Sequence, residues 1–305
     1  MNTPWGDIAV SDAHVHFFSS AFFQSLAKQK GIPVADIGSA LNLELPAADP
    51  GELANRWVQA LDQNGISAAA LMASIPGDEA SVVDAVQRYP DRFHGYFMFD
   101  PLQPEAPQRA HAALRSGLRG ICFFPAMHGY SIADEPVTSV LDSISGERGV
   151  VVFVHCGVLS VGIRNKLGLP SRFDMRFSNP VDLHPVALRY PQLNFVVPHF
   201  GAGYFREALM VADLCPNVYF DTSSSNSWTK YQTPAITLKD VFQRALDVVG
   251  PRRLLFGSDS SFFPRGWNAS VLESQIRVLS DLYIGPENAT LILGGNLRRV
   301  LSEKR

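Results

Sequence analysis

Short apolar runs recur along the whole chain, and most of them are separated by stretches with helical spacing. Within each run the apolar residues are nearly continuous, which is typical of parallel strands that are covered on both faces. We therefore predict eight strands, over Ile8–His14, Ile66–Ala73, Phe93–Phe99, Leu118–Phe124, Val150–His155, Leu193–His199, Asn217–Asp221 and Arg253–Asp259.

The stretches between the strands place their apolar residues on one helical face. In Glu52–Gln63, for example, Leu53, Trp57 and Leu61 fall on one stripe, as expected of a helix that packs on a sheet. The predicted helices are Glu52–Gln63, Ala80–Tyr89, Pro107–Ser116, Pro185–Tyr190, Ala202–Leu214, Leu238–Val249, Ala269–Leu282 and Pro286–Leu301.

Eight strands that alternate with helices predict an α/β protein with a (β/α)8 TIM barrel. The alternative is a doubly wound open sheet, but no G-x-G-x-x-G sequence follows the first strand. Two connections are long, Phe17–Pro50 and Cys156–His184, and both follow the carboxyl ends of strands, where barrel enzymes keep their chemistry. Because no break in composition interrupts the pattern, we expect one domain over residues 1–305.

Composition narrows the possible partners. The chain has 26 lysines and arginines against 29 aspartates and glutamates, a net charge of −3, which gives no footprint for nucleic acid or an anionic membrane. No apolar stretch is long enough to span a membrane, and no secretory signal is seen. Three scattered cysteines favour a reducing compartment, so we expect a cytoplasmic protein. We expect its binding partner to be a small-molecule substrate.

Histidine and aspartate stand at the ends of four predicted strands. His14 and His16 are two residues apart, so in a strand their side chains point to the same face and could hold one divalent ion. His155, His199 and Asp259 each end an apolar run in the same way. Polar groups at a buried barrel rim must be paired or bound to a ligand, so this pattern favours a metal site over simple packing.

The order of these residues resembles that of the amidohydrolase superfamily. The resemblance is carried by DAHVHFF at residues 12–18, PHFGAG at 198–203, FGSDSSF at 256–262 and ILGGNLRRVL at 292–301. The chain is most similar to the amidohydrolase-2 branch, which includes aminocarboxymuconate-semialdehyde decarboxylase-like enzymes. These motifs extend over the whole chain, which implies that all of it forms the barrel.

The resemblance also implies a ligand set. It gives one divalent metal ion, zinc or else manganese, bound by His14, His16, His155 and Asp259. It places His199 beside the ion as a catalytic residue and lets Asp259 take the proton of an activated water. Binuclear members carry a Lys or Glu at the end of the fourth strand, where this chain has neither, so we expect one ion. Cys122 in that strand is expected to be a buried structural thiol instead of a ligand.

Candidate substrate contacts lie on loops near the predicted mouth of the barrel. A guanidinium grips a carboxylate well, so Arg164 and Arg265 are candidates for binding an acidic substrate, with His128 at the same rim. Arg172 and Arg176 lie in the same long loop as Arg164 and are further candidates, and each of the four arginines could instead be a solvated loop charge. Aromatic residues that could contact an apolar substrate body are Phe17, Phe18, Phe22, Phe23, Trp228, Phe262, Phe263 and Trp267. Asp12 could orient a neighbouring group or serve a structural role.

Two catalytic functions fit this set of residues. The first is a metal-dependent hydrolase of a small-molecule amide, ester or lactone that bears a carboxylate. The second is a non-oxidative, metal-dependent decarboxylase of an aromatic or unsaturated acid. A non-catalytic barrel is a third reading, which the complete ligand set disfavours. The resemblance favours hydrolysis, and it makes a homodimer possible.

Overall fold

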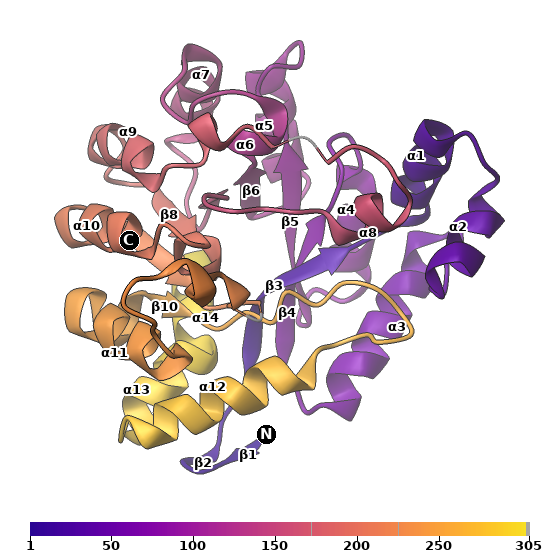
Figure 1. The fold of residues 1–305 in the computed structure, drawn as a ribbon. Helices are drawn as coiled ribbons and strands as arrows, with labels where there is room; N and C mark the ends of the chain where they lie inside the picture. Colours follow the sequence, from indigo (N-terminus) through magenta and orange to yellow (C-terminus); the bar gives the residue numbers. More distant parts are fainter. Residues whose placement is uncertain (172, 225, 303–305) are drawn as a thin grey trace.

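Eight parallel strands form one sheet that closes on itself, with helices around it (Figure 1). The computed structural model describes residues 1–171, 173–224 and 226–302. In the sheet every strand pairs with its neighbour in the sequence, in the order β10-β9-β8-β7-β6-β5-β4-β3. The strands are β3 (Ser11–Phe17), β4 (Ala68–Ala73), β5 (Phe93–Phe99), β6 (Gly120–Phe123), β7 (Val151–Val154), β8 (Asn194–Val197), β9 (Val218–Asp221) and β10 (Leu254–Leu255). The predicted (β/α)8 barrel is therefore confirmed, and the open sheet is excluded.

The first and last strands meet at a seam that closes the barrel. Although β10 is only two residues long, the chain beyond it continues alongside β3. The amide of Ala13 donates to the carbonyl of Phe256 at 2.8 Å, and the amide of Asp259 donates to the carbonyl of His14 at 3.0 Å. The amide of His16 donates to the carbonyl of Ser260 at 2.8 Å. These bonds hold the end of the last strand directly against the His14–His16 segment.

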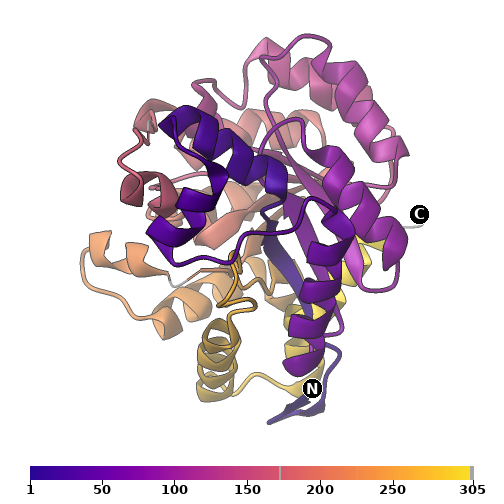
Figure 2. The same ribbon diagram turned by 90° about the vertical axis from the view of Figure 1, so that its right-hand side faces the viewer.

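Helices surround the barrel and cover its outer face in both views (Figures 1 and 2). A short antiparallel hairpin, β1 (Asn2–Thr3) and β2 (Gly6–Asp7), lies at the end away from α1 (Figure 2). The α-helices are α1 (Ser20–Lys30), α2 (Val34–Leu41), α3 (Pro50–Gln63), α4 (Glu79–Arg88), α5 (Ala106–Arg115), α6 (Pro125–His128), α7 (Glu135–Ile144), α8 (Gly162–Lys166), α9 (Leu183–Arg189), α10 (Phe205–Leu214), α11 (Leu238–Val249), α12 (Ala269–Asp281), α13 (Pro286–Thr290) and α14 (Asn296–Ser302).

Alternation along each strand divides the core into two layers. In β4, Ala70 and Met72 face the inside of the barrel, whereas Ala69 and Leu71 pack against the helices. A third apolar cluster lies apart from both layers and joins α1, α2 and α8. These three helices come from the two long connections, and we call them the cap (Figure 1). The cap thus has an apolar cluster of its own, against which Phe18, Ile75 and Phe262 from the loops after the barrel strands also pack.

Several predicted elements differ from the observed ones. The first strand was predicted to end at His14 but continues to Phe17, because the polar histidines occupy interior positions within the strand. The final predicted helix is interrupted between α13 and α14 by a π-helical turn, Leu291–Gly295. A Cβ on Gly294 would lie 2.6 Å from the carbonyl oxygen of Ala9, so the chain can pass this close to the start of β3 only with glycine.

Some elements were not predicted. Helix α7 was missed, and the long connections, which were predicted only as loops, contain α1, α2 and α8. Short 3-10 turns also occur, at Met175–Phe177, Pro180–Asp182, Pro198–Gly201, Ser227–Tyr231 and Pro251–Arg253. Across the part of the chain that the structure describes, no helix is both long and apolar enough to cross a bilayer.

Candidate metal centre

Strand β3 carries two of the five predicted histidine and aspartate groups on its interior face. Val15 and Phe17 pack between the barrel and the helices, so His14 and His16 point to the opposite side, into the barrel. The register with β4 shifts by one residue between Asp12 and Val15, which marks a β-bulge just before the histidines. Bulges of this kind re-aim side chains next to functional sites.

Asp12 holds this bulge in place. Its Oδ1 accepts hydrogen bonds from the amides of His14 at 2.9 Å and Ser258 at 3.0 Å. Its Oδ2 accepts from the indole N–H of Trp267 at 2.7 Å. Burial raises the pKa of Asp12 to about 6, although these hydrogen bonds oppose the shift. Asp12 therefore joins β3 to the last strand and does not face the cavity.

The side chains of His14, His16 and Asp259 converge at the end of the seam. Oδ1 of Asp259 lies 3.2 Å from Nε2 of His16 and 3.9 Å from Nε2 of His14. A tetrahedral shell with bonds of ~2.0–2.1 Å places its ligand atoms roughly 3.3 Å apart. The observed spacing therefore suits three ligands of one divalent ion.

A second group, formed by His14, His155 and His199, adjoins the first and shares His14. All three imidazoles are buried, and their ligand atoms lie within 4.8 Å of one another. Nε2 of His14 and Nδ1 of His155 are buried without a hydrogen-bond partner in the described residues. A native structure rarely leaves such atoms unpaired, so these two nitrogens fit a cation bound between them.

Hydrogen bonds on the far side of the rings fix which nitrogens face the centre. The hydroxyl of Ser74 donates to the carbonyl of Met72 at 2.9 Å, so it accepts from Nδ1 of His16 at 2.9 Å. Nδ1 of His14 donates to Oδ2 of Asp221 at 2.6 Å. In both rings Nε2 is left as the nitrogen that faces Asp259. Partners of this kind are the usual support of histidines that bind metals.

Sequence reasoning missed Asp221 and Ser223. Asp221 ends the seventh predicted strand, as His155 and His199 end theirs, so its position was a usable signal. The hydroxyl of Ser223 lies 2.7 Å from Oδ2 of Asp221 and 2.8 Å from Nδ1 of His199. Both residues are fully buried beneath the histidines.

The charges of the centre are interdependent. Burial lowers the pKa of His14, but the Asp221 carboxylate outweighs burial and raises it above its ordinary value. Burial lowers the pKa of both His155 and His199, which favours their neutral form. Burial raises the pKa of Asp259, but the surrounding imidazoles bring it below its ordinary value, so the group is ionised at neutral pH. The neutral imidazoles of His155 and His199 and the ionised carboxylate of Asp259 are suitable donors for a divalent cation.

The backbone at two of these residues is unusual. His199 has φ of 56° and Asp259 has φ of 58°, in the left-handed region that non-glycine residues seldom occupy. Strain of this kind persists where the surrounding structure enforces it, and it concentrates at functional sites. In both cases it turns the residue that follows a strand back toward the centre.

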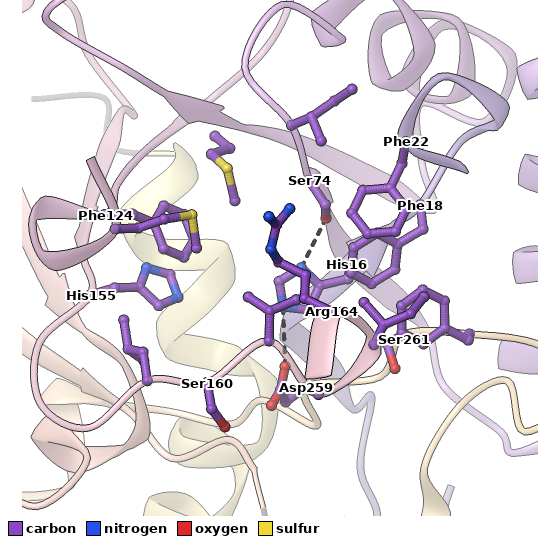
Figure 3. Close-up of a pocket in the computed structure, with 18 of the residues that line it drawn as sticks. His16, Phe18, Phe22, Ser74, Phe124, His155, Ser160, Arg164, Asp259 and Ser261 are labelled. Atoms are coloured by element: carbon purple, nitrogen blue, oxygen red, sulfur yellow. Dashed lines mark hydrogen bonds and ion pairs between the residues drawn. The ribbon is translucent and has the colours of Figure 1, made fainter. Parts of the chain in front are cut away.

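A cavity of about 700 Å³ lies above the centre and beneath the cap (Figure 3). His16, His155, His199 and Asp259 lie on its floor, together with Ser74. His14 lies below them and does not line the cavity. The close-up shows His16 between its two partners, Ser74 on one side and Asp259 on the other (Figure 3).

The three predicted substrate contacts all line this cavity, but they differ in their surroundings. Arg164, on α8 of the cap, is half-buried and donates to the carbonyl of Pro170 at 3.0 Å and to Oε1 of Gln29 at 2.7 Å. Arg265 is exposed and bonds the hydroxyl of Ser261 at 2.7 Å. His128 follows β6 on α6, and burial lowers its pKa.

Of the two remaining arginines, only Arg176 can be compared with the cavity, and it does not line it. Arg176 is 81% exposed and forms an ion pair with Asp174, outside the cavity. Arg172 lies outside the described residues. Cys122 lies inside the barrel, belongs to neither group of metal-competent residues, and burial raises the pKa of its thiol.

Only some of the predicted aromatic residues reach the cavity. Phe18 stacks on His16 with ring centroids 5.1 Å apart and on Phe262 at 4.2 Å, and Phe22 adjoins both phenylalanines. On the opposite wall Phe124, which was not predicted, stacks on His155 at 3.8 Å. The others, Phe17, Phe23, Trp228, Phe263 and Trp267, do not line it.

Solved structures with similar folds include enzymes. The chain is similar to a probable 2-pyrone-4,6-dicarboxylic acid hydrolase from Acinetobacter baumannii, with a TM-score of 0.62 and 15% identity, covering 97% of this chain and 100% of that one. It is also similar to an amidohydrolase from Burkholderia multivorans with bound zinc, with a TM-score of 0.63 and 14% identity, covering 97% and 99%. At these identities the likeness shows the fold.

Sequence comparison finds a partial match to a curated protein and a match to a family model over nearly the whole chain. Protein fluG of Emericella nidulans is 32% identical over 87 residues, which are 28% of this chain and only 10% of that protein. The model of the Amidohydro_2 family, described as amidohydrolase, matches residues 11–302. This match includes both histidines of β3 and every other residue of the centre described above. The chain therefore belongs to the Amidohydro_2 family of amidohydrolases.

Proposed function

We propose that this protein is a metal-dependent hydrolase of a small-molecule amide, ester or lactone. The observation that carries the proposal is the convergence of His14, His16 and Asp259, with Nε2 of His14 buried and unpaired in the described residues. In the proposal, His14, His16, His155 and Asp259 hold one divalent ion, zinc or else manganese. When bound, such an ion is a Lewis acid that polarises a carbonyl group and lowers the pKa of water.

In this proposal, Asp259 and His199 would carry out the proton transfers of the reaction. Asp259 is ionised and lines the cavity, so it can accept a proton from the attacking water. His199 is neutral because burial lowers its pKa, and it also lines the cavity, so it can take up a proton or bind the reacting carbonyl group. The left-handed backbone at both residues keeps these groups in place before substrate arrives.

The cavity favours a substrate with an apolar body and an acidic end. Phe18, Phe262 and Phe124 supply aromatic walls, and Arg164 supplies a guanidinium from the cap. Arg164 bonds an amide oxygen and a carbonyl oxygen and has no ion pair among the described residues. A substrate carboxylate would be its first charged partner, in the fork geometry that arginine prefers.

The test is a reaction assay on protein with measured metal content. Zinc-loaded and manganese-loaded samples are incubated with lactones, esters, amides and hydroxybenzoates. Hydrolysis releases protons without carbon dioxide, whereas the alternative activity, decarboxylation, releases carbon dioxide. We expect the first result. Carbon dioxide release from the hydroxybenzoates, with no hydrolysis of the other substrates, would replace the proposal with a decarboxylase.

A pair of variants ties the activity to the centre. Asp259→Asn keeps the size of the side chain but removes the anionic ligand, and we expect it to lower both bound metal and kcat by at least about tenfold. Asp174→Asn is the control, because Asp174 pairs with Arg176 outside the cavity. Full metal content and full activity in Asp259→Asn would contradict the proposed centre.

A further inference from the structure

Four buried side chains form a continuous hydrogen-bonded chain beneath the cavity. Nδ1 of His14 lies 2.6 Å from Oδ2 of Asp221, and the same oxygen lies 2.7 Å from the hydroxyl of Ser223. That hydroxyl in turn lies 2.8 Å from Nδ1 of His199. One carboxylate and one serine thus connect two imidazoles that stack with centroids 5.1 Å apart.

The hydrogens in this chain can be assigned by counting donors. Asp221 receives the amide of Ser223 on Oδ1 at 2.9 Å, and receives Nδ1 of His14 on Oδ2. A carboxylate has no hydrogen to give, so the hydrogen between Asp221 and Ser223 comes from the serine hydroxyl. The hydroxyl has only that one hydrogen and can only accept from His199. Nδ1 of His199 therefore carries a hydrogen.

Both imidazoles are held in the same tautomer by this arrangement. With a hydrogen on Nδ1, each neutral ring has a free lone pair on Nε2. For His14 the other side of the ring agrees, because Nε2 is buried and has no partner among the described residues. His199 lines the cavity, so its lone pair is available to a bound molecule.

The segment that carries Asp221 and Ser223 is fixed from two sides. The hydroxyl of Thr222 donates to Oε1 of Gln275 at 2.7 Å, and Nε2 of Gln275 donates to the carbonyl of Thr222 at 2.8 Å. In the segment after the neighbouring strand β10, a Cβ on Gly257 would lie 2.3 Å from Oδ1 of Asp221. The fold thus leaves room for the carboxylate and clamps the residue between the two partners.

We infer that Asp221 and Ser223 are positioning residues that set the tautomers of His14 and His199 together. The inference rests on the proposed function, in which His14 binds the metal ion and His199 serves the substrate. Asp221 fixes His14 directly, whereas it fixes His199 only through the hydroxyl of Ser223. The two histidines can therefore be separated experimentally by changing one residue at a time.

The test is the protonation of the ring nitrogens, read by two-bond ¹H–¹⁵N correlation spectra of zinc-loaded protein labelled with ¹⁵N-histidine. We expect His199, assigned by its loss in His199→Gln, to carry its hydrogen on Nδ1. In Ser223→Ala this pattern should disappear from His199 and remain at His14. In Asp221→Asn it should change at both. A hydrogen on Nε2 of His199 in the unchanged protein, or no change in Ser223→Ala, would overturn the inference.

Metal content and kinetics give a second reading. In Ser223→Ala, His14 keeps its 2.6 Å bond to Asp221 and loses only a longer, 3.3 Å contact with the serine hydroxyl. This variant should therefore bind zinc nearly as the unchanged protein does, whereas kcat should fall on the order of 10-fold to 100-fold with little change in KM. Asp221→Asn should also lose zinc affinity. If no substrate is hydrolysed while the ring spectra agree, the proposed function fails and the inference stands. Hydrolysis of a substrate, together with the hydrogen on Nε2 of His199, would overturn this inference and leave the proposed function in place.

Discussion

At the scale of single residues, Asp12 shows how a buried carboxylate can serve the site without facing it. Its two oxygens accept from His14, Ser258 and Trp267, which belong to both sides of the seam. An asparagine in its place has one acceptor and one donor, so at least one of these three N–H groups loses its partner. We expect Asp12→Asn to lower the free energy of unfolding by about 1–3 kcal/mol in urea titrations.

Trp267→Phe provides the matched background for this measurement. It removes the indole N–H, so the side-chain NH2 group of the introduced asparagine no longer faces a second hydrogen-bond donor. The cost of Asp12→Asn should therefore be smaller when it is measured in Trp267→Phe. An equal cost in both backgrounds would show that the indole bond contributes nothing.

His94 on β5 makes stability depend on pH, away from the metal centre. Burial lowers the pKa of His94 below its ordinary value of 6.5, and the nearby Arg119 and Arg298 add to the effect. The unfolded chain therefore takes up a proton before the folded one, and the contribution of His94 is present above pH 6.5 and lost as pH falls. We expect the unfolding free energy of the unchanged protein to fall more steeply below this pH than that of His94→Gln. Parallel curves would contradict this assignment.

Residues at the ends of apolar strands could be identified from the sequence, and those in irregular surroundings could not. His155, His199 and Asp259 each follow an uninterrupted apolar run, so their common edge was predictable. Ser223 follows a polar pair and has no such pattern. Phe124 could not be predicted as a cavity residue either, because its contact with His155 depends on the turn into α6.

At the scale of elements, the cap links two insertions that are far apart in the sequence. Phe22 and Leu26 of α1 pack in one cluster with Ile163 of α8. The bond between Arg164 and Gln29 connects the same two helices above the cavity. Because α8 has only five residues, its position depends on this packing more than on its own helical stability.

Arg164 is the cap residue with the clearest expected effect on substrate binding. For a carboxylate-bearing substrate we expect Arg164→Gln to raise KM on the order of 10-fold to 100-fold and to leave kcat nearly unchanged. The reason is that the guanidinium contacts a part of the substrate that does not react. Michaelis curves at constant metal content measure the effect.

Arg176→Gln is the control for this variant, since Arg176 lies outside the cavity and is 81% exposed. Its KM should match that of the unchanged protein. Equal values of KM in Arg164→Gln and Arg176→Gln would remove Arg164 from the substrate site.

Helices were predicted well where an apolar stripe stood between two strands. Leu238–Val249 was predicted with its observed bounds. Helix α7 was missed although Val137, Val140, Leu141 and Ile144 have helical spacing, so its signal was present in the sequence. The cap helices are different, because their apolar residues pack against one another across about 140 residues of sequence, and no local pattern reveals that contact.

At the scale of the whole molecule, a bound ion should stabilise the fold. An ion that binds only the folded chain adds about 2.7 kcal/mol to its stability at a hundredfold excess over Kd. We expect zinc to raise the melting temperature of the unchanged protein and of His111→Ala, and to raise that of His16→Ala much less. His111 is a suitable control because it is an exposed histidine paired with Glu147. An equal shift in all three proteins, measured by scanning calorimetry, would place zinc elsewhere.

The seam also determines when, during synthesis of the chain, the residues on its two sides can meet. His14 and His16 leave the ribosome well before Asp259, which is made about 240 residues later, and the backbone bonds that bring them together join the two ends of the sheet. Contacts this distant in sequence form late in folding. In the proposed centre, Asp259 can therefore join the histidines only after the last strand has been made, and a prematurely terminated product that lacks this strand would have the histidines without this carboxylate.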